Sequence, residues 1–348
     1  MSSTKEIVFR PTTPADAAGL GELLARSFNV SRDSAFLRPE VLTWKYWVPR
    51  GDWNGPRSYI FEEEGAPIAH GGIWPVLIGS GADEVRGCQV IDWAAAKGSP
   101  GAGVYLMREI SHSLDFIQAV GGTDMTRRVL PAIGFSERAQ VWRGARPLRP
   151  LRQILSHQTR NWKLAPRLAR NWIWSRSPVA PPAANWTVEQ IEPQHLVGNA
   201  TEGSPPRFSH RTKEFFEHYL KCPIGRMTLH QIRDASGPQG HFVLIVLHGQ
   251  ARLAGVWLRE TTREAWRTTF LLAQQVAASF PDAYEFLAAG TRGESEQAAV
   301  EAGLRIVGDA PVFLLNQGRQ LSLTSDYQFQ LCDNDEAFLD IGGPDYVT

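Results

Sequence analysis

The order of apolar and polar residues along the chain predicts alternating strands and helices. Short apolar runs of strand length lie at residues 7–10, 59–61, 69–77 and 90–96. Across residues 20–28 and 104–117, apolar side chains instead recur every three or four positions, as on one face of a helix. The fold class expected for residues 1–145 is therefore α/β.

A second set of elements in the same order follows residue 186. Its apolar runs and helical patterns lie at 186–191, 241–248, 252–259, 264–280, 285–289 and 294–302. Gly303-Leu304 follows the last helical pattern as Gly134-Phe135 follows the corresponding pattern of the first half. This repetition predicts two tandem domains of one plan, residues 1–145 and 186–348.

The segment between them, residues 146–185, is basic and rich in leucine and tryptophan. Its basic residues have no acidic residue among them: Arg146, Arg149, Arg152, Arg160, Lys163, Arg167, Arg170 and Arg176. We interpret it as a partly helical linker. Three roles are open: packing of one domain on the other, contact of residues 146–176 with an anionic membrane, and contact with RNA or a nucleotide.

The composition is that of a globular protein and does not identify a binding partner. The chain of 348 residues is 43% hydrophobic and 21% charged, as in an ordinary globular protein of about two domains. Its 36 basic and 36 acidic residues balance, so nucleic acid is not an expected partner. The 3 cysteines are widely spaced and predict no metal site. Without an apolar signal core or a run of about eighteen apolar residues, we expect a cytoplasmic protein.

The candidate chemistry begins where the apolar run 90–96 meets a glycine-rich turn. Gly98, Gly101 and Gly103 precede the helical pattern that starts at Val104. The first turn of a helix has backbone N–H groups without intrahelical partners, and glycine lets an anion approach them. This stretch therefore predicts a diphosphate site.

Three motifs in this order resemble the GCN5-related N-acetyltransferase (GNAT) superfamily. They are the opening strand and helix cap Ile7–Ala17, the loop Gly98-x-x-Gly101-x-Gly103, and the closing Gly-Phe of Leu130–Phe135. The loop has glycine where the family usually has a basic residue, so Lys97, Arg127 or Arg128 is expected to supply that charge. The resemblance implies two GNAT-like domains, each with a mixed, mostly antiparallel central sheet flanked by helices.

The same resemblance implies an acyl-CoA donor, direct transfer to an amine, and no metal. The donor would bind along the strand and loop at Ile91, Trp93, Ala94, Gly98, Gly101, Ala102, Gly103, Val104 and Arg127. Asp92 is the first candidate for the general base, and His70, near its ordinary pKa, is a second group suited to proton transfer. Tyr105 is the candidate donor of a proton to the departing thiolate. For Asp92 a structural hydrogen bond, and for His70 a buried structural role, are the alternatives.

The second half lacks the glycine loop. Arg259–Glu264 stands in its place, with carboxylates that disfavour a diphosphate, so residues 186–348 are predicted to be a degenerate copy. The ending Gln328–Phe338 resembles an acidic tail motif of tandem acyltransferases that act on bacterial exopolysaccharides and cell envelopes. Its acidic residues Asp333, Asp335 and Glu336 are expected to form a solvated tail or to contact the linker.

The function implied is acyl-CoA-dependent N-acyl transfer, with acetyl as the expected acyl group. The acceptor implied by the resemblance is a small amine, such as an amino sugar or an envelope or polysaccharide precursor. One alternative is an aminoacyl-tRNA-dependent transferase similar to the Fem peptidyltransferases. Another is a non-catalytic binding module of a membrane-associated polysaccharide-assembly system, with the protein at the periphery of the inner membrane.

Overall fold

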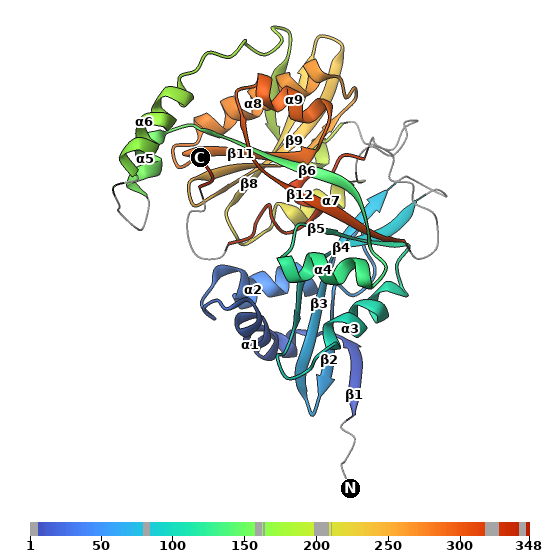
Figure 1. Ribbon diagram of the computed structural model, residues 1–348. Coiled ribbons are helices and arrows are strands. Elements are labelled where there is room, and N and C mark those ends of the chain that lie inside the picture. Colours follow the sequence, from blue (N-terminus) through green and yellow to red (C-terminus); the bar gives the residue numbers. More distant parts are fainter. Residues whose placement is uncertain are drawn as a thin grey trace.

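The computed structural model describes residues 6–78, 84–156, 162, 164–197, 209, 211–316, 327–340 and 346–348. Within them, twelve strands form one continuous mixed sheet with helices on both faces (Figure 1). The predicted α/β class and the mixed, mostly antiparallel sheet are confirmed. No helix in these ranges has the length and apolar character needed to cross a bilayer.

The first half contains strands and helices in the predicted order. Its strands are β1 (Ile7–Pro11), β2 (Ser58–Glu63), β3 (Ala66–Ile78), β4 (Val85–Ala95), β5 (Phe116–Val120) and β6 (Ser136–Pro147). Its helices are α1 (Ala17–Phe28), α2 (Pro39–Leu42), α3 (Ala102–Ser111) and α4 (Asp124–Ala132), and the linker adds α5 (Pro150–Leu155) and α6 (Leu164–Ser175). The predicted helix 104–117 was too long, because Ile117 belongs to β5, where it pairs in parallel with Cys88 of β4.

The second half repeats this order from residue 187. Its strands are β7 (Thr187–Ile191), β8 (Arg226–Asp234), β9 (Gly237–Leu247), β10 (Gln250–Leu258), β11 (Glu285–Thr291) and β12 (Arg305–Asn316). Its helices are α7 (Lys213–Tyr219), α8 (Arg263–Ser279) and α9 (Glu294–Glu301). Strand β8 was not predicted, whereas β9, β10, β11, α8 and α9 match the sequence patterns.

The two halves exchange their last strands. The order across the sheet is β1-β2-β3-β4-β5-β12-β6-β11-β10-β9-β8-β7. Strand β12 therefore lies between β5 and β6, and β6 pairs with β11 of the second half. Each exchanged strand covers what would otherwise be an open sheet edge of the other half. Figure 1 shows β6 and β12 at the junction of the halves.

A core of mixed origin holds the two halves together on one face of the sheet. It combines Leu20 of α1 and Trp44 with Phe216 of α7 and Phe338 of the C-terminal tail. The rings of Trp44 and Phe338 lie 4.9 Å apart, edge to face. Residues of α3 and α4 pack on the opposite face of the first half, and α8 and α9 pack on the second half. The tail at 327–338 thereby returns to the first half, beside β3 and β4.

Candidate functional site

Strands β4 and β5 separate after a short parallel contact. Only Gly87–Gln89 pairs with Phe116–Gln118, and within the described chain Val90–Ala95 has no strand partner on the β5 side. Asp92 has a φ of 47°, and the register with β3 shifts at this point. A bulge of this kind bends the strand and increases its twist. The first half therefore opens between two parallel strands, just before the glycine loop.

The start of α3 has amides that the described chain leaves free. Gly101, with a φ of 82°, precedes the helix, which has neither a side-chain cap nor an acidic residue in its first turn. The amides of Gly103 and Val104 have no acceptor within the described residues. Free amides and the helix dipole together favour a bound anion. The free amides lie where the sequence predicted a diphosphate site, and binding of a diphosphate there stays a prediction.

Trp93 fixes this loop against β4. Its indole Nε1 donates to the carbonyl of Gly103 over 2.9 Å, and a Cβ on Gly103 would lie 3.1 Å from the same nitrogen. Glycine at 103 thus allows the close approach of α3 to β4. Tyr105 lies on the outer side of the same turn and is 62% exposed, so its predicted role at the thiolate stays a prediction. Arg127 is exposed on α4, and its predicted contact with phosphate also stays a prediction.

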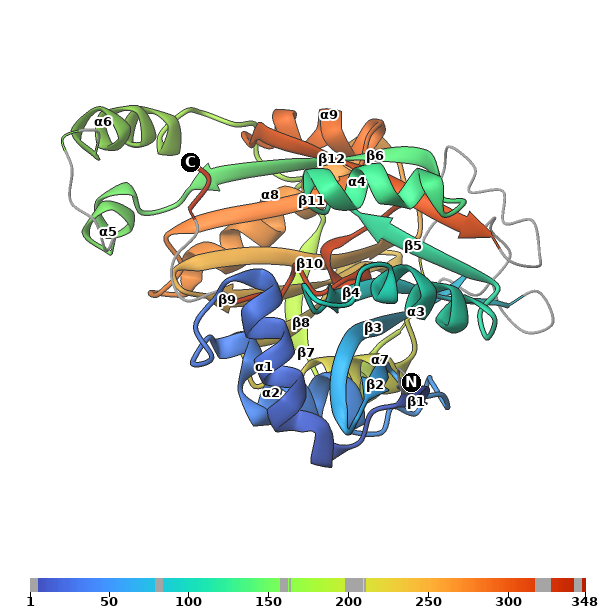
Figure 2. The same cartoon turned by 60° about the horizontal axis from the view of Figure 1, so that its bottom comes forward.

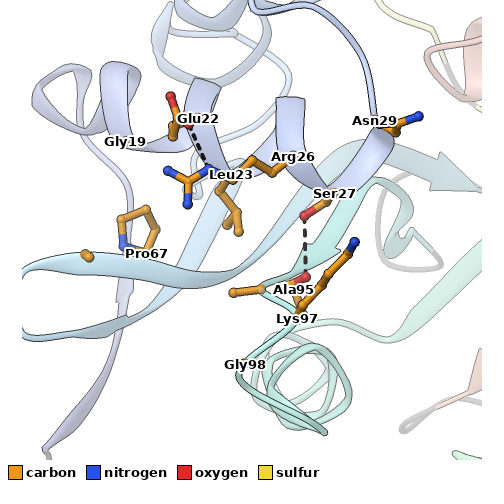
Figure 3. Close-up of a pocket in the computed structure, with 12 residues that line it drawn as sticks. Gly19, Glu22, Leu23, Arg26, Ser27, Asn29, Pro67, Ala95, Lys97 and Gly98 are labelled. Carbon is orange, nitrogen blue, oxygen red and sulfur yellow. Dashed lines mark hydrogen bonds and ion pairs between the residues drawn. The ribbon is translucent and has the colours of Figure 1, made fainter.

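A cavity of about 710 Å³ adjoins the loop on the side of α1 (Figure 3). Its lining comes from α1, the start of β3, the end of β4, and Lys97 and Gly98 of the loop. Ser27 Oγ donates to the carbonyl of Ala95 over 3.4 Å, which ties α1 to the end of β4. Lys97 and Arg26 give the lining positive charge, and Glu22 pairs with Arg26 at 2.7 Å.

Asp92 belongs to a buried charge cluster at the bulge. Its Oδ2 lies 2.5 Å from Lys45 Nζ, and Tyr46 OH donates to the same carboxylate. Lys45 also contacts Asp335 Oδ2 at 3.1 Å and is only 1% exposed. Burial alone would raise the pKa of Asp92, but the charge of Lys45 and these hydrogen bonds lower it. Asp92 is therefore held as an ion-paired carboxylate.

The pKa of Asp335 is raised, whereas the pKa of Asp92 is lowered. Burial raises its pKa against the opposing charge of Lys45, and the neighbouring charge of Asp92 raises it further. Its side chain keeps 15% exposure, compared with 5% for Asp92. Of the two carboxylates that share Lys45, Asp335 is both the more accessible and the more basic.

The acidic tail is buried and adjoins the opening between β4 and β5, so the expectation of a solvated tail or a linker contact was wrong. Asp333 pairs with Arg211 at 2.7 Å, and Glu336 pairs with Arg143 of β6. A Cβ on Gly121, directly after β5, would lie 3.9 Å from Glu336 Oε1. Asp335 and Glu336 thus reach from the bulge of β4 to the end of β5. Sequence analysis missed Lys45, Tyr46 and both of these tail residues as site residues, because no local motif links them to the loop.

His70 does not have the ordinary pKa that was expected. The side chain is fully buried, and burial lowers its pKa to about 4. Its Nδ1 donates to the carbonyl of Asp92 over 2.8 Å, and Nε2 accepts from Ser58 Oγ over 2.9 Å. Both ring nitrogens are therefore occupied, and the imidazole supports the bulge at Asp92 as a neutral group.

This burial makes stability depend on pH. Between the ordinary histidine pKa of 6.5 and about 4, the unfolded chain binds a proton at this site that the folded chain does not bind. Stability is thus lost as the pH falls through this window, by up to about 3 kcal/mol from this residue. We expect His70→Gln to reduce the slope of the unfolding free energy against pH, measured by urea titration, by up to about one proton.

The matched control is His112→Gln, since the His112 side chain is 58% exposed. This variant should keep the wild-type slope. Equal slopes in wild type and His70→Gln would show that His70 is protonated in the folded state.

The corresponding opening in the second half is filled. Strands β10 and β11 pair in parallel from Gln250 to Leu253 and then separate. Gln330 of the tail enters this gap, accepts from the amide of Val256 over 2.7 Å, and donates to the carbonyl of the same residue. The remaining cavity is about 10 Å³. In addition, Thr262 caps α8 by accepting from Ala265 N over 3.2 Å, so one first-turn amide is already used.

No protein-family model and no curated protein sequence matches this chain. Solved structures do match in fold. A GCN5-related N-acetyltransferase from Anabaena variabilis has 12% identity and a TM-score of 0.55 over 89% of this chain and 72% of its own. N-myristoyltransferase from Saccharomyces cerevisiae with bound myristoyl-CoA has 12% identity and a TM-score of 0.56 over 95% and 85%.

A third similar structure is a putative acetyltransferase from Pyrococcus horikoshii, with 11% identity and a TM-score of 0.51 over 93% of this chain and 94% of its own. These likenesses extend over most of the chain. The chain therefore has the GNAT fold, as the sequence motifs predicted.

Proposed function

We propose that the chain is an acyl-CoA-dependent N-acyltransferase whose first half carries the reaction, with acetyl as the transferred group. The observation that supports this proposal most strongly is the contrast between the halves. In the first half, the strands separate beside a glycine loop with free amides, and in the second the same opening is filled by Gln330. The second half would then serve as a scaffold that supplies the tail.

The donor would lie with its diphosphate at the amides of Gly103 and Val104 and its thioester along the unpaired edge of β4. Backbone N–H groups at Ile91–Ala94 would polarise the thioester carbonyl. A neutral amine attacks the carbonyl carbon, so that the C–N bond forms as the C–S bond breaks. CoA leaves as a thiolate, and Tyr105 is the proposed source of the proton that it takes up.

We assign the proton lost by the amine to Asp335 instead of Asp92. A base must accept a proton during the reaction, and Asp92 is stabilised as an anion by two donors. Asp335 is more exposed, and burial raises its pKa. Asp92 would then balance the charge of Lys45 and fix the bulge.

The acceptor proposed is a small amine, with amino sugars and envelope precursors first among them because of the resemblance of the tandem plan. The cavity beside α1 provides space and both signs of charge for a polar acceptor close to the loop.

Calorimetric titration with acetyl-CoA and myristoyl-CoA, combined with hydrogen exchange, tests the proposal. We expect heat of binding, protection of residues 98–110, and release of free thiol when an accepted amine is added. Absence of both heat and protection would favour the non-catalytic binding module. Salt-sensitive binding of aminoacyl-tRNA without CoA binding would favour the Fem-like alternative.

A further inference from the structure

Helices α5 and α6 present an apolar surface to solvent. Both views show them side by side at one end of the molecule, away from the central sheet (Figures 1 and 2). Large apolar side chains of the two helices, and of Trp162 between them in the sequence, are 42–79% exposed: Leu151, Leu155, Trp162, Trp172 and Ile173. We call these five residues the α5–α6 face. Exposed apolar groups gathered in this way indicate a binding surface.

The opposite side of the two helices is fixed to the body of the protein. Asn171 donates to Gln153 over 2.9 Å, and Gln153 donates to Glu285 of β11 over 3.0 Å. Trp174 donates to the carbonyl of Gly303 over 3.0 Å and is buried. Packing on the second half therefore explains the buried residues of the linker. It does not explain why the side chains of the α5–α6 face are apolar.

Positive charge borders this face without compensation. Arg152, Arg170 and Arg176 are exposed, and within the described chain none of them forms an ion pair. The sequence from 138 to 188 contains no aspartate or glutamate. Arg160 and Lys163 belong to the same stretch of sequence and lie outside the described residues. A partner of negative charge is thus favoured beside these three arginines.

The mixture of side chains favours lipid over RNA. Successive residues of a helix are rotated by about 100°, which places Arg170 and Ile173 on one exposed side of α6, and the exposed Arg176 follows directly after the helix. Three of the five residues, Leu151, Leu155 and Ile173, are aliphatic and offer no ring for a base to stack on, whereas Trp162 offers one exposed ring. The ring of Trp172 is covered by the Arg176 guanidinium at 3.8 Å. Apolar side chains flanked by arginine and tryptophan are typical of helices that lie in a membrane interface.

We infer that the α5–α6 face binds the surface of an anionic lipid bilayer, with its apolar side chains among the acyl chains and Arg152, Arg170 and Arg176 at the headgroups. The protein would attach peripherally, without a spanning helix. This inference is independent of the proposed acyl transfer, since none of these residues takes part in the site at β4.

Co-sedimentation of the full chain with vesicles tests this inference. We expect binding to phosphatidylcholine vesicles that contain phosphatidylglycerol, weak binding to phosphatidylcholine alone, and weaker binding at high salt. Ile173→Ser should weaken the partition by about tenfold, and Arg170→Gln with Arg176→Gln should reduce the preference for anionic lipid, with Arg152 still present.

Matched controls come from exposed residues elsewhere. Val300→Ser on α9 also replaces an exposed aliphatic side chain, which is 54% exposed. Arg138→Gln removes an exposed charge of β6. Both should bind as wild type does. The inference is wrong if wild type does not bind anionic vesicles, or if Val300→Ser weakens binding as much as Ile173→Ser. It is also wrong if light scattering shows a dimer that Ile173→Ser dissociates, or if the face binds RNA and not vesicles.

Discussion

Replacement of Gly101 by glutamate is expected to abolish binding of acyl-CoA, with a loss of affinity of at least about a hundredfold. The added side chain would stand at the entrance to α3, where the amides of Gly103 and Val104 are free. Its negative charge would occupy the place of the diphosphate. Each charge-assisted hydrogen bond lost there is worth roughly 1.5–3 kcal/mol, so two of them suffice for this effect. Calorimetry with acetyl-CoA measures it directly.

Gly65→Glu provides a control matched in backbone strain. Gly65 lies in the exposed turn between β2 and β3 with a φ of 79°, close to the 82° of Gly101. A Cβ at Gly65 would meet nothing within 4 Å, and one at Gly101 would meet only the ring of Tyr105 at 3.5 Å. Both variants should therefore lose about 1–2 kcal/mol of stability from the left-handed conformation. If Gly101→Glu binds acetyl-CoA as Gly65→Glu does, the loop is not the diphosphate site.

Replacement of Asp335 by asparagine is expected to lower kcat by a factor of about 10²–10⁴, as for loss of a general base. The cost in stability should be about 1–3 kcal/mol, because Lys45 keeps Asp92 as its partner. In wild type, kcat should rise with pH through the pKa of Asp335, which burial places above its usual range. Asp335→Asn should lose that dependence. Initial rates of thiol release across pH measure both effects.

Asp333→Asn is the control within the same tail. Its removal leaves Arg211 buried without the 2.7 Å ion pair, so the loss of stability should be larger, about 3–5 kcal/mol. If activity followed stability alone, Asp333→Asn would be the less active variant at a temperature where both are folded. An unchanged pH profile in Asp335→Asn would assign Asp335 a structural role.

Most elements of the fold could be predicted from local features of the sequence. The strand, glycine turn and helix from Val90 to Ser111 lie within a short stretch, so their spacing alone indicated free amides at the start of α3. The repeat of elements also followed from patterns of apolar residues within each half. Strand β8 was missed because its residues mix polar and apolar types without a clear alternation.

The pKa values and ion-pair partners of the site residues could not be predicted from the sequence. His70 has the pattern of an ordinary strand residue, and its pKa is lowered to about 4 mainly by its complete burial in the folded chain. The partners of Lys45 are separated from it by 47 and 290 positions along the chain. No periodicity or motif extends over such distances, so the sequence did not indicate that a tail carboxylate would reach the bulge of β4.

By itself the sequence determined the α/β plan, its repetition and the glycine loop, because hydrophobic periodicity and glycine spacing act over a few residues. The tertiary structure decided the exchange of β6 and β12, the filling of the second opening by Gln330, and the position of Asp335 beside Asp92. These features depend on which distant segments meet when the shared core forms, since burial and pairing of charges are properties of the folded chain.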